Sequence, residues 1–256
     1  MSLLFDTKLA LNYKNTSQKI RVMSEAWVKS NLYCPRCGRI KIKKEKNNMP
    51  VADFFCDNCG EIFELKSKKN RIGHKITDGA YDTAIERITS NSNPDLLVML
   101  YNTTNMSISE LWITPKQFFV PDIIEKRKPL SVKARRAGWT GCNILYSQIP
   151  EQGKICIIKD GEWEDKDSVI YTYNNRLKFI TRDMEARGWL LDILNCVNSI
   201  HKKYFSLSDM YKFTGALKLK HPNNNNIEAK IRQQLQILRD KGFIIFQGNG
   251  KYIKVD

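Results

Sequence analysis

The sequence contains no run of uncharged apolar residues that approaches the length of a membrane-spanning helix. Residues Met1 to Tyr13 are too polar to form the hydrophobic centre of a secretory signal peptide. We therefore expect a soluble, cytoplasmic protein without a membrane partner, and a monomer in solution. A chain of 256 residues can bury a substantial core, either in one large domain or in two smaller ones.

Acidic residues are outnumbered, with 27 Asp and Glu against 42 Lys and Arg and a net charge of +15. Such an excess favours a polyanionic partner over a small neutral substrate, although a basic surface can also serve solubility alone. Clustering favours the first interpretation, because the basic residues gather within Lys41–Lys46, Lys66–Lys75, Lys126–Lys128 and Lys133–Arg136.

A disulfide framework is not expected, because the seven cysteines are irregularly spaced in a chain without an export signal. Four of them form two Cys-x-x-Cys pairs, Cys34 with Cys37 and Cys56 with Cys59, which are separated by 18 residues. This spacing is typical of a zinc ribbon; a redox dithiol or plain buried thiols are the alternatives.

The two pairs have the features of zinc knuckles. Gly38 and Gly60 follow the second cysteine of each pair and permit a tight backbone turn. Four protein thiolates would fill a tetrahedral Zn²⁺ site and leave no position for water, so we expect the zinc to be structural.

A candidate catalytic site surrounds the second pair. If Pro50 to Phe55 and Ile62 to Lys66 form strands, Glu64 and Lys66 project to one face, close to Asp53. Two carboxylates suit Mg²⁺, and a lysine can orient or deprotonate the attacking water or neutralise charge on a phosphate. An acid followed after ten residues by Glu-x-Lys resembles the PD-(D/E)xK nucleases. The alternative is a solvated charge pair on an exposed strand.

Cys56 and Cys59 lie between Asp53 and Glu64, so a zinc knuckle would close the hairpin that carries the acids and would fix the register of its strands. Glu25 could add a further carboxylate. An exposed helical glutamate is more common, and Glu25 is not included in the predicted site.

Alternation and helical spacing predict the remaining elements of the first part of the chain. We expect a mixed α/β sheet. The predicted elements are helices at Ser17–Ser30, capped by Ser17, and at Thr77–Thr89, strands at Leu96–Tyr101, Glu110–Thr114 and Lys154–Lys159, and a polar stretch that ends near Arg182. His74, in the basic connection before Thr77, could contact phosphate or simply be solvated.

Residues 134–142 combine two arginines with a tryptophan between two glycines. Arg135, Arg136 and Trp139 would make a flexible cationic loop with an aromatic tip that binds phosphates and stacks on, or wedges between, bases. The alternative is a core tryptophan beneath a glycine turn.

From Asp183 the pattern changes to three helices and a terminal hairpin. Helices are predicted within Trp189–Ile200, after a Ser206/Asp209 capping box, and at Ile227–Lys241, with strands at Phe243–Gln247 and Lys251–Val255. This order predicts an α+β winged helix, in which the third helix normally enters the DNA major groove. Winged helices also serve as dimerisation or docking modules.

The third helix has a buried stripe and an opposite outward face. With Ile227, Ile231, Leu235 and Leu238 inward, four residues face outward: Ala229, Arg232, Gln233 and Gln236. They could be ordinary solvated residues, or Arg232 could read guanine, the glutamines adenine, and Ala229 could leave space for a methyl group. Lys254, on the wing, is expected to meet phosphate.

Over almost its whole length the sequence resembles the DpnI-like methyl-directed restriction endonucleases. The matching motifs are Cys34-Pro-x-Cys37, Pro50-Val-Ala-Asp53-Phe, Cys56 and Cys59, Phe63-Glu-Leu-Lys-Ser-Lys-Lys69, Asp78-Gly-Ala-Tyr81, Ala134-Arg-Arg-Ala-Gly-Trp139 and Lys230-Ile-Arg-Gln-Gln-Leu-Gln-Ile-Leu-Arg-Asp-Lys-Gly242. One departure from the wider nuclease pattern is that Pro50 is not adjacent to Asp53.

The resemblance implies a type II endonuclease that cuts double-stranded DNA at GATC when its adenine is methylated. It implies an α/β PD-(D/E)xK catalytic domain over residues 1–182, with an embedded zinc-ribbon-like site of four cysteines, and a winged helix over 183–256. Asp53, Glu64 and the backbone carbonyl of Leu65 would hold Mg²⁺.

A second class of function stays open, in which the chain is a non-catalytic DNA-binding regulator with a zinc ribbon and a winged helix. The Asp53, Glu64 and Lys66 set distinguishes the two classes, because two carboxylates near a phosphate repel it unless a metal intervenes.

Overall fold

The computed structural model describes residues 2–45, 52–90, 92–181 and 183–255. The chain divides into two compact units, one made of Met1–Ser147 with Gln152–Leu177 and the other of Gln148–Glu151 with Lys178–Asp256. Within the described ranges, every helix is too short or too polar to cross a membrane.

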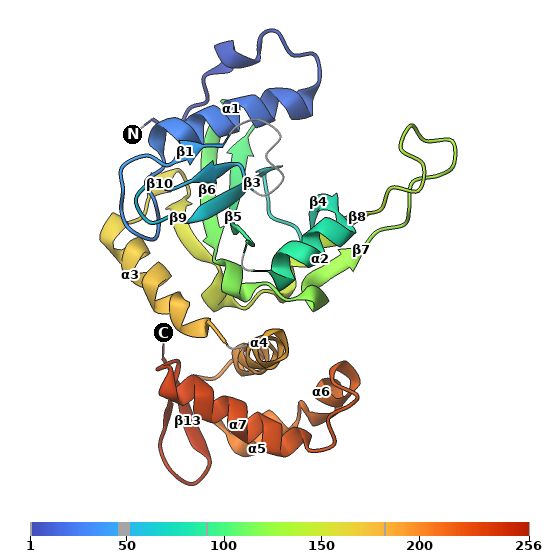
Figure 1. The fold of residues 1–256 in the computed structure, drawn as a ribbon. Coiled ribbons are helices and arrows are strands. Elements are labelled where there is room, and N and C mark those ends of the chain that lie inside the picture. The colour runs from blue at the N-terminus through green and yellow to red at the C-terminus, as the bar shows by residue number, and fades with distance from the viewer. Residues whose placement is uncertain (1, 46–51, 91, 182, 256) are drawn as a thin grey trace. The chain divides into compact units, whose positions relative to one another are not determined.

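The first unit is built on a mixed sheet of seven strands in the order β1-β2-β3-β5-β6-β9-β10 (Figure 1). Its strands are β1 (Lys43–Lys44), β2 (Phe54–Phe55), β3 (Ile62–Lys69), β5 (Asp95–Asn102), β6 (Ser107–Thr114), β9 (Ile155–Lys159) and β10 (Glu162–Trp163). Only β3 and β5 are parallel among these neighbours, while the other pairs are antiparallel. The predicted mixed sheet is thereby confirmed.

The two central strands β3 and β5 differ in how far they are buried. β5 is buried from Asp95 to Tyr101, as expected for a strand covered on both faces. β3 is more polar, and it pairs Glu64 with Leu96 and Lys66 with Val98. An apolar neighbour thus supports the strand that carries the predicted catalytic residues.

Helix α1 (Thr16–Asn31) packs Met23, Trp27 and Val28 into the main hydrophobic core. The ring of Trp27 stacks on Trp163 of β10 with 5.7 Å between ring centroids. The predicted cap at Ser17 is wrong, because the Asn15 side chain accepts hydrogen bonds from the Ser17 and Gln18 amides.

Helix α3 (Lys166–Arg176) lies in the stretch that the sequence described only as polar, without a predicted element. Its polar composition hid an amphipathic helix, in which Val169 and Tyr173 are four residues apart and both join the core. The Asp165 side chain caps it by accepting a hydrogen bond from the Ser168 amide.

The helix predicted at Thr77–Thr89 is half wrong, because strand β4 (Ile76–Ala80) precedes helix α2 (Tyr81–Thr89). Gly79 disfavours a helix, and β4 finds an antiparallel partner in β8 (Gly141–Ile144). With β7 (Ile124–Lys126) they form a second sheet in the order β4-β8-β7. Short 3-10 helices complete the chain at Thr7–Ala10, Lys116–Phe118, Pro121–Ile123, Tyr146–Gln148, Glu151–Gly153 and Leu177–Phe179.

Buried charges lie where the sheet meets α3. Glu61 is 2% exposed and accepts hydrogen bonds from Arg36 at 2.7 Å and Lys116 at 2.6 Å. Asp95, which is fully buried, accepts from the Lys116 amide at 2.8 Å and from the Tyr173 hydroxyl at 2.5 Å. Each buried carboxylate therefore has partners, as burial requires.

The second unit contains helices α4 (Met184–Ser199), α5 (Leu207–Tyr211), α6 (Thr214–Lys220) and α7 (Ile227–Asp240), with strands β11 (Tyr204–Ser206), β12 (Ile244–Phe246) and β13 (Lys251–Lys254). The sheet order is β11-β13-β12. The Ser206/Asp209 capping box is confirmed. β11 was not predicted, because a three-residue strand with one buried side chain has too little periodicity to detect.

Tyr173→Phe should lower the free energy of unfolding by about 1–3 kcal/mol, because it leaves the buried Asp95 carboxyl without one donor. Burial and the charge of Glu61 raise the pKa of Asp95 to about 7 against the opposing hydrogen bonds from Tyr173 and the Lys116 amide. Asp95 is therefore mainly neutral at pH 5.5 and charged at pH 8.5. Removing a hydrogen-bond donor costs more free energy at a charged acceptor than at a neutral one. The loss of unfolding free energy should therefore be larger at pH 8.5.

Urea unfolding at both pH values measures this difference. Tyr171→Phe is the matched control, because Tyr171 lies on the same helix but is 70% exposed. Equal losses for the two variants would contradict the role assigned to the Tyr173 hydroxyl.

Candidate active site and zinc site

Asp53 meets β3 directly. Its amide donates to the Phe63 carbonyl at 2.9 Å, and one carboxylate oxygen, Oδ2, accepts from the Leu65 amide at 2.8 Å. The strand predicted at Pro50–Phe55 is shorter in the structure, since β2 begins at Phe54, and Pro50 and Val51 lie outside the described residues. Asp53 is therefore held to β3 by both a backbone and a side-chain hydrogen bond, just before β2 begins.

Lys66 lies between two carboxylates. Its Nζ is 2.7 Å from Glu64 Oε1 and 2.5 Å from Asp78 Oδ1 of β4. The other oxygen of Glu64 lies 3.8 Å from the guanidinium of Arg87 on α2. Elements from both sheets thus converge on the Glu64 and Lys66 pair.

The charges in this group depend on one another. Burial opposes the charge of Lys66, but the attraction of Glu64 and Asp78 outweighs it and raises the lysine pKa. Burial also raises the pKa of Glu64, although Lys66 works in the opposite direction. For Asp78, Lys66 overcomes the effect of burial and lowers the carboxyl pKa. The lysine is therefore held as a cation.

Glu25 contradicts the expectation of an exposed helical glutamate, since it is 5% exposed. Arg21 lies 2.6 Å and Lys44 2.7 Å from its two carboxylate oxygens. Burial raises the pKa of Asp53, and the nearby Glu25 carboxylate raises it further against the effect of the Leu65 amide. The site therefore contains an acid that the sequence analysis left out.

These residues line one pocket of about 380 Å³ between α1, β3 and β5. Arg21 and Glu25 come from α1, Asp53 precedes β2, and Tyr101 comes from β5. Glu64, Lys66 and Ser67 of β3 complete its polar lining. The predicted catalytic residues Asp53, Glu64 and Lys66 are thus brought together in one pocket, to which both α1 and β3 contribute acidic and cationic side chains.

The donor set fits a hard divalent cation. Asp53 and Glu64 offer carboxylate oxygens in one pocket, and the repulsion between these half-buried acids is what a cation would relieve. The amide and carbonyl of one strand residue point to the same side, so the Leu65 carbonyl faces the side of Asp53, to which its amide donates. These three groups could hold Mg²⁺.

Sequence reasoning missed Asp78, Arg87 and Glu25 as parts of this group. Asp78 stands in the Asp78-Gly-Ala-Tyr81 motif, but the segment was assigned to a helix, which hid its place on a strand of the second sheet, from which its side chain reaches Lys66. For Glu25, the signal was its position on α1 three residues before the buried Val28, which places it on the same side of the helix.

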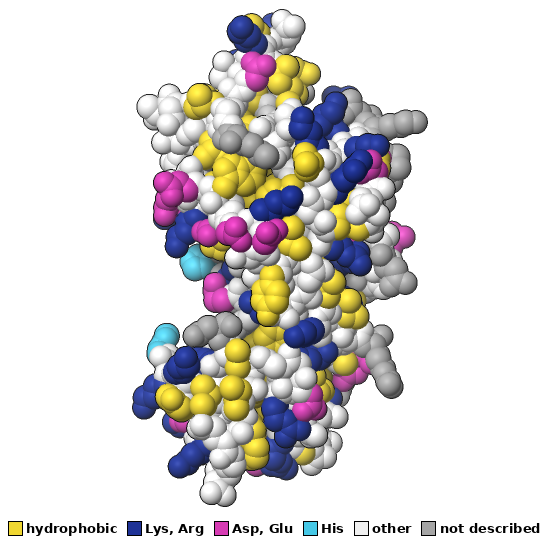
Figure 2. Space-filling view, turned by 90° about the vertical axis from the view of Figure 1, so that its left-hand side faces the viewer, with side chains coloured by type: hydrophobic (Ala, Val, Ile, Leu, Met, Phe, Trp, Pro, Cys, Tyr) yellow, Lys and Arg dark blue, Asp and Glu magenta, His cyan; other side chains and the backbone are white. Residues whose placement is uncertain are grey.

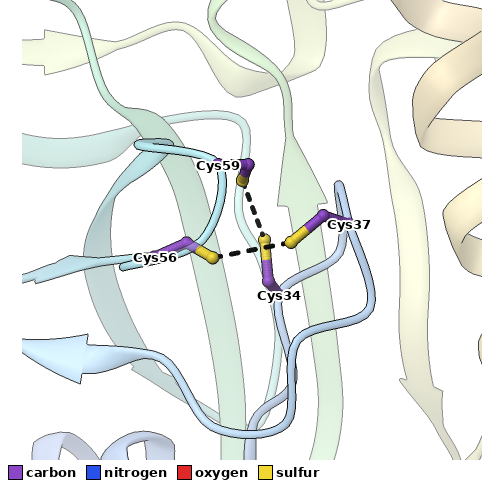
Figure 3. Close-up of side chains that lie close together, drawn as sticks. All are labelled: Cys34, Cys37, Cys56 and Cys59. Atoms are coloured by element: carbon purple, nitrogen blue, oxygen red, sulfur yellow. Dashed lines mark hydrogen bonds between the residues drawn. The ribbon is translucent and has the colours of Figure 1, made fainter.

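The four cysteines form the predicted cluster, and their sulfur atoms all lie within 4.8 Å of one another (Figure 3). Cys34 and Cys59 are 3.6 Å apart, as are Cys37 and Cys56. Four thiolates about 2.3 Å from a tetrahedral Zn²⁺ would be separated by roughly 3.8 Å, so the spacing fits zinc. Burial raises the pKa of the Cys34 thiol, a cost that a bound cation offsets.

The two knuckles have the same backbone design. In the first, the Gly38 amide donates to the Cys34 carbonyl at 2.8 Å, and in the second the Gly60 amide donates to Cys56 at 2.9 Å. Both glycines have positive φ, 74° and 72°, which explains their position after each second cysteine. The second knuckle joins β2 to β3, between Asp53 and Glu64.

The loop between β7 and β8 extends away from the body of the first unit (Figure 1). Arg135 and Arg136 are exposed on it. Trp139 does not form an aromatic tip: it lies near the base of the loop, and the guanidinium of Arg136 lies 4.6 Å from its ring. A Cβ on Gly141 would come within 2.8 Å of this ring, so the glycine makes room for it.

The outward residues of α7 lie on the surface of the second unit: Ala229, Arg232, Gln233 and Gln236. Arg232 donates to the Tyr211 hydroxyl of α5. Lys254, which was expected to meet phosphate, is half-buried: its Nζ donates to the Ile200 carbonyl, and burial lowers its pKa.

Cys59→Ser should destabilise the first unit and lower bound metal, because a four-thiolate zinc site contributes directly to folding. Elemental analysis of the wild type should find about one zinc per chain. Cys156→Ser, outside the cluster, is the control and should keep the metal. A zinc-free preparation with unchanged melting temperature would contradict the assignment.

Comparison with known families covers both units. Residues 1–182 match the DpnI family, described as the Dam-replacing family, and residues 185–254 match its C-terminal domain, the Dam-replacing HTH domain. Membership implies a restriction enzyme of the DpnI type that acts on DNA through a C-terminal winged helix. The chain belongs to the Dam-replacing family.

Proposed function

We propose that the protein is a methylation-dependent type II restriction endonuclease that cleaves double-stranded DNA at adenine-methylated GATC by Mg²⁺-dependent hydrolysis. Residues 1–182 would form a PD-(D/E)xK catalytic domain and 183–256 a DNA-reading winged helix, in a monomeric cytoplasmic enzyme. The convergence of Asp53, Glu64 and Lys66 in one pocket carries this proposal. The basic side chains, spread widely over the face shown in Figure 2, suit a polyanion.

The position of Lys66 favours two of its three expected roles. Because Glu64 and Asp78 keep it protonated, Lys66 is a poor base, but it can donate to the attacking water or to a nonbridging phosphate oxygen. Asp78 is a second carboxylate partner of the ammonium, beside Glu64. In the reaction, a P–O bond forms to water while the bridging P–O bond breaks; the water proton passes to solvent, and the departing alkoxide takes a proton from solvent to leave as an alcohol.

The ground for a magnesium site is the oxygen donor set of Asp53, Glu64 and the Leu65 carbonyl. When bound, Mg²⁺ would activate water and offset charge on the phosphate. Asp53 contributes the rigidity of this site, because its hydrogen bond to the Leu65 amide fixes the carboxylate against β3. Glu64 is fixed in turn by Lys66 and Arg87.

The zinc is proposed to be structural. All four positions of the cluster are protein thiolates, so no position stays open for a reacting water.

We assign DNA reading to two exposed surfaces. On α7, the proposed readers are Ala229, Arg232, Gln233 and Gln236, and on the β7–β8 loop Arg135 and Arg136 would meet phosphates. Trp139 could reach a base only after Arg136 leaves its ring, which argues for stacking during binding instead of a preformed wedge.

The alternative, a non-catalytic DNA-binding regulator, explains the winged helix and the zinc cluster equally well. It does not explain why half-buried acids are gathered beside Lys66, since they would repel a phosphate. This observation favours the nuclease.

Asp53→Asn or Lys66→Ala should lower the cleavage rate by roughly 100- to 1000-fold or more, because the first weakens a proposed Mg²⁺ ligand and the second removes the cation that would donate to the attacking water or the phosphate. Single-turnover cleavage of methylated plasmid with Mg²⁺ measures this, while duplex affinity should stay within a few-fold. Asp82→Asn removes an exposed acid of α2 as a control. Cleavage near the wild-type rate by either variant would refute the assignment.

Gln233→Ala should reduce the preference for methylated over unmethylated duplex by roughly 5- to 150-fold, the range of one lost base contact. The exposed Lys251 on β13 is the matched phosphate control, and Lys251→Ala should weaken both duplexes alike. Titration of the full chain without divalent cations compares them. An unchanged preference in Gln233→Ala would place methyl recognition elsewhere.

A further inference from the structure

We propose that a second pocket of the first unit binds a backbone phosphate of the DNA that flanks the scissile phosphodiester. The inference rests on the proposed function, because it assigns the pocket to the same duplex. The pocket has a volume of about 390 Å³ and is lined by Arg71, Ile72, Gly73, His74, Tyr146, Ser147 and Lys154. It shares no lining residue with the catalytic pocket.

The chemistry of the lining suits an anion. Arg71 and Lys154 are cationic, His74 and Ser147 can donate hydrogen bonds, and none of the described lining residues is acidic. The Glu125 carboxylate is engaged elsewhere, by Lys75 at 2.5 Å and by Asn143 at 2.8 Å. A guanidinium and an ammonium around one hollow are a typical arrangement for a phosphate group.

The pocket is built by local contacts that hold its two walls together. The Ser147 amide donates to the His74 carbonyl at 3.2 Å, which joins the wall before β4 to the wall after β8. Asn70 has a positive φ of 64°, and the Arg71 amide donates to the Lys69 carbonyl at 2.7 Å, so the chain turns sharply as it leaves β3. Lys154 lies over the ring of Tyr146, with 5.5 Å from Nζ to the centroid.

The pocket is close to the catalytic one along β3. Ser67 and Tyr101 line the catalytic pocket, and the Asn70 amide donates to the Tyr101 carbonyl at 3.3 Å, one residue before Arg71. Arg71 is the fourth residue after Ser67, so their Cα atoms are at most about 14 Å apart. That span corresponds to roughly four base-pair steps at 3.4 Å each. A duplex in the catalytic pocket could therefore present a flanking phosphate to Arg71.

The test compares Arg71→Ala/Lys154→Ala with a control that loses the same charge, Lys29→Ala/Lys159→Ala, at two exposed positions of the same unit. Affinity for a methylated duplex with long flanks is measured in the full chain, without divalent cations, over a range of salt concentrations. The pocket variant should bind more weakly, and its slope of log K against log salt should fall by up to about 2, roughly 0.9 per lost contact. The control should lose less than half of this.

Two further measurements locate the contact. A duplex trimmed to the recognition site should remove the difference between the pocket variant and the control. Arg71→Lys/Lys154→Arg, which keeps both charges, should restore the salt slope, so a lost slope cannot be attributed to misfolding. Equal slopes for the pocket variant and the control on long duplexes would overturn the proposal.

The source of the phosphate is a separate outcome. Inorganic phosphate is titrated against the wild type and the pocket variant by calorimetry. If the variant loses phosphate binding while its duplex affinity equals that of the control, the site takes a free anion and the DNA assignment is wrong.

Failure of this inference differs from failure of the proposed function. If the wild type does not cleave methylated DNA but the pocket variant alone loses flank-dependent binding, the pocket proposal stands and the nuclease proposal falls. If the wild type cleaves methylated DNA but the pocket variant and the control have equal salt slopes, the nuclease proposal stands and the pocket proposal falls.

Discussion

The antiparallel pairing of β2 with β3 is the constraint on which the catalytic site depends. Only two residue pairs form this ladder, Phe54 with Phe63 and Phe55 with Ile62, and both strands bury phenylalanines beneath it. So short a ladder specifies its register weakly by itself. The Cys56–Cys59 knuckle supplies the missing specification, because its backbone turn and the sulfur cluster fix where the hairpin closes. Asp53 and Glu64 then face one pocket as a consequence of cysteine geometry.

The same knuckle is anchored on its outer side by buried charge. Glu61 lies two residues after Cys59 and binds Arg36 of the first knuckle and Lys116 beyond β6. The Lys116 amide in turn donates to Asp95 at the start of β5. Breaking one partner of such a network leaves a buried charge uncompensated, which costs more than the intact pair contributes. The cysteine cluster and the central strands therefore form one cooperative structure.

Sequence patterns predicted those parts in which local chemistry dictates geometry. The Cys-x-x-Cys spacing, the buried run of β5, the stripe of α7 and the Ser206 capping box each follow from short-range rules. The errors fall where a distant partner decides: β4 is a strand because β8 pairs with it, and Tyr173 of α3 is buried where its hydroxyl meets Asp95. Asp78 and Glu25 were not assigned to the site for the same reason. Only the folded structure shows that Asp78 approaches Lys66 and that Glu25 approaches Asp53.

Because both Cys-x-x-Cys knuckles meet at one sulfur cluster, insertions should be tolerated differently in different segments of the chain. Both ends of the segment between Gly38 and Phe55 are pinned at the sulfur cluster, and loop-closure entropy grows only slowly with added residues, so insertions there disturb little. The ten residues between Asp53 and Glu64 have no such freedom, because one added residue would turn the β3 side chains to the opposite face. Related sequences should therefore vary in length before Asp53 and keep a constant spacing after it.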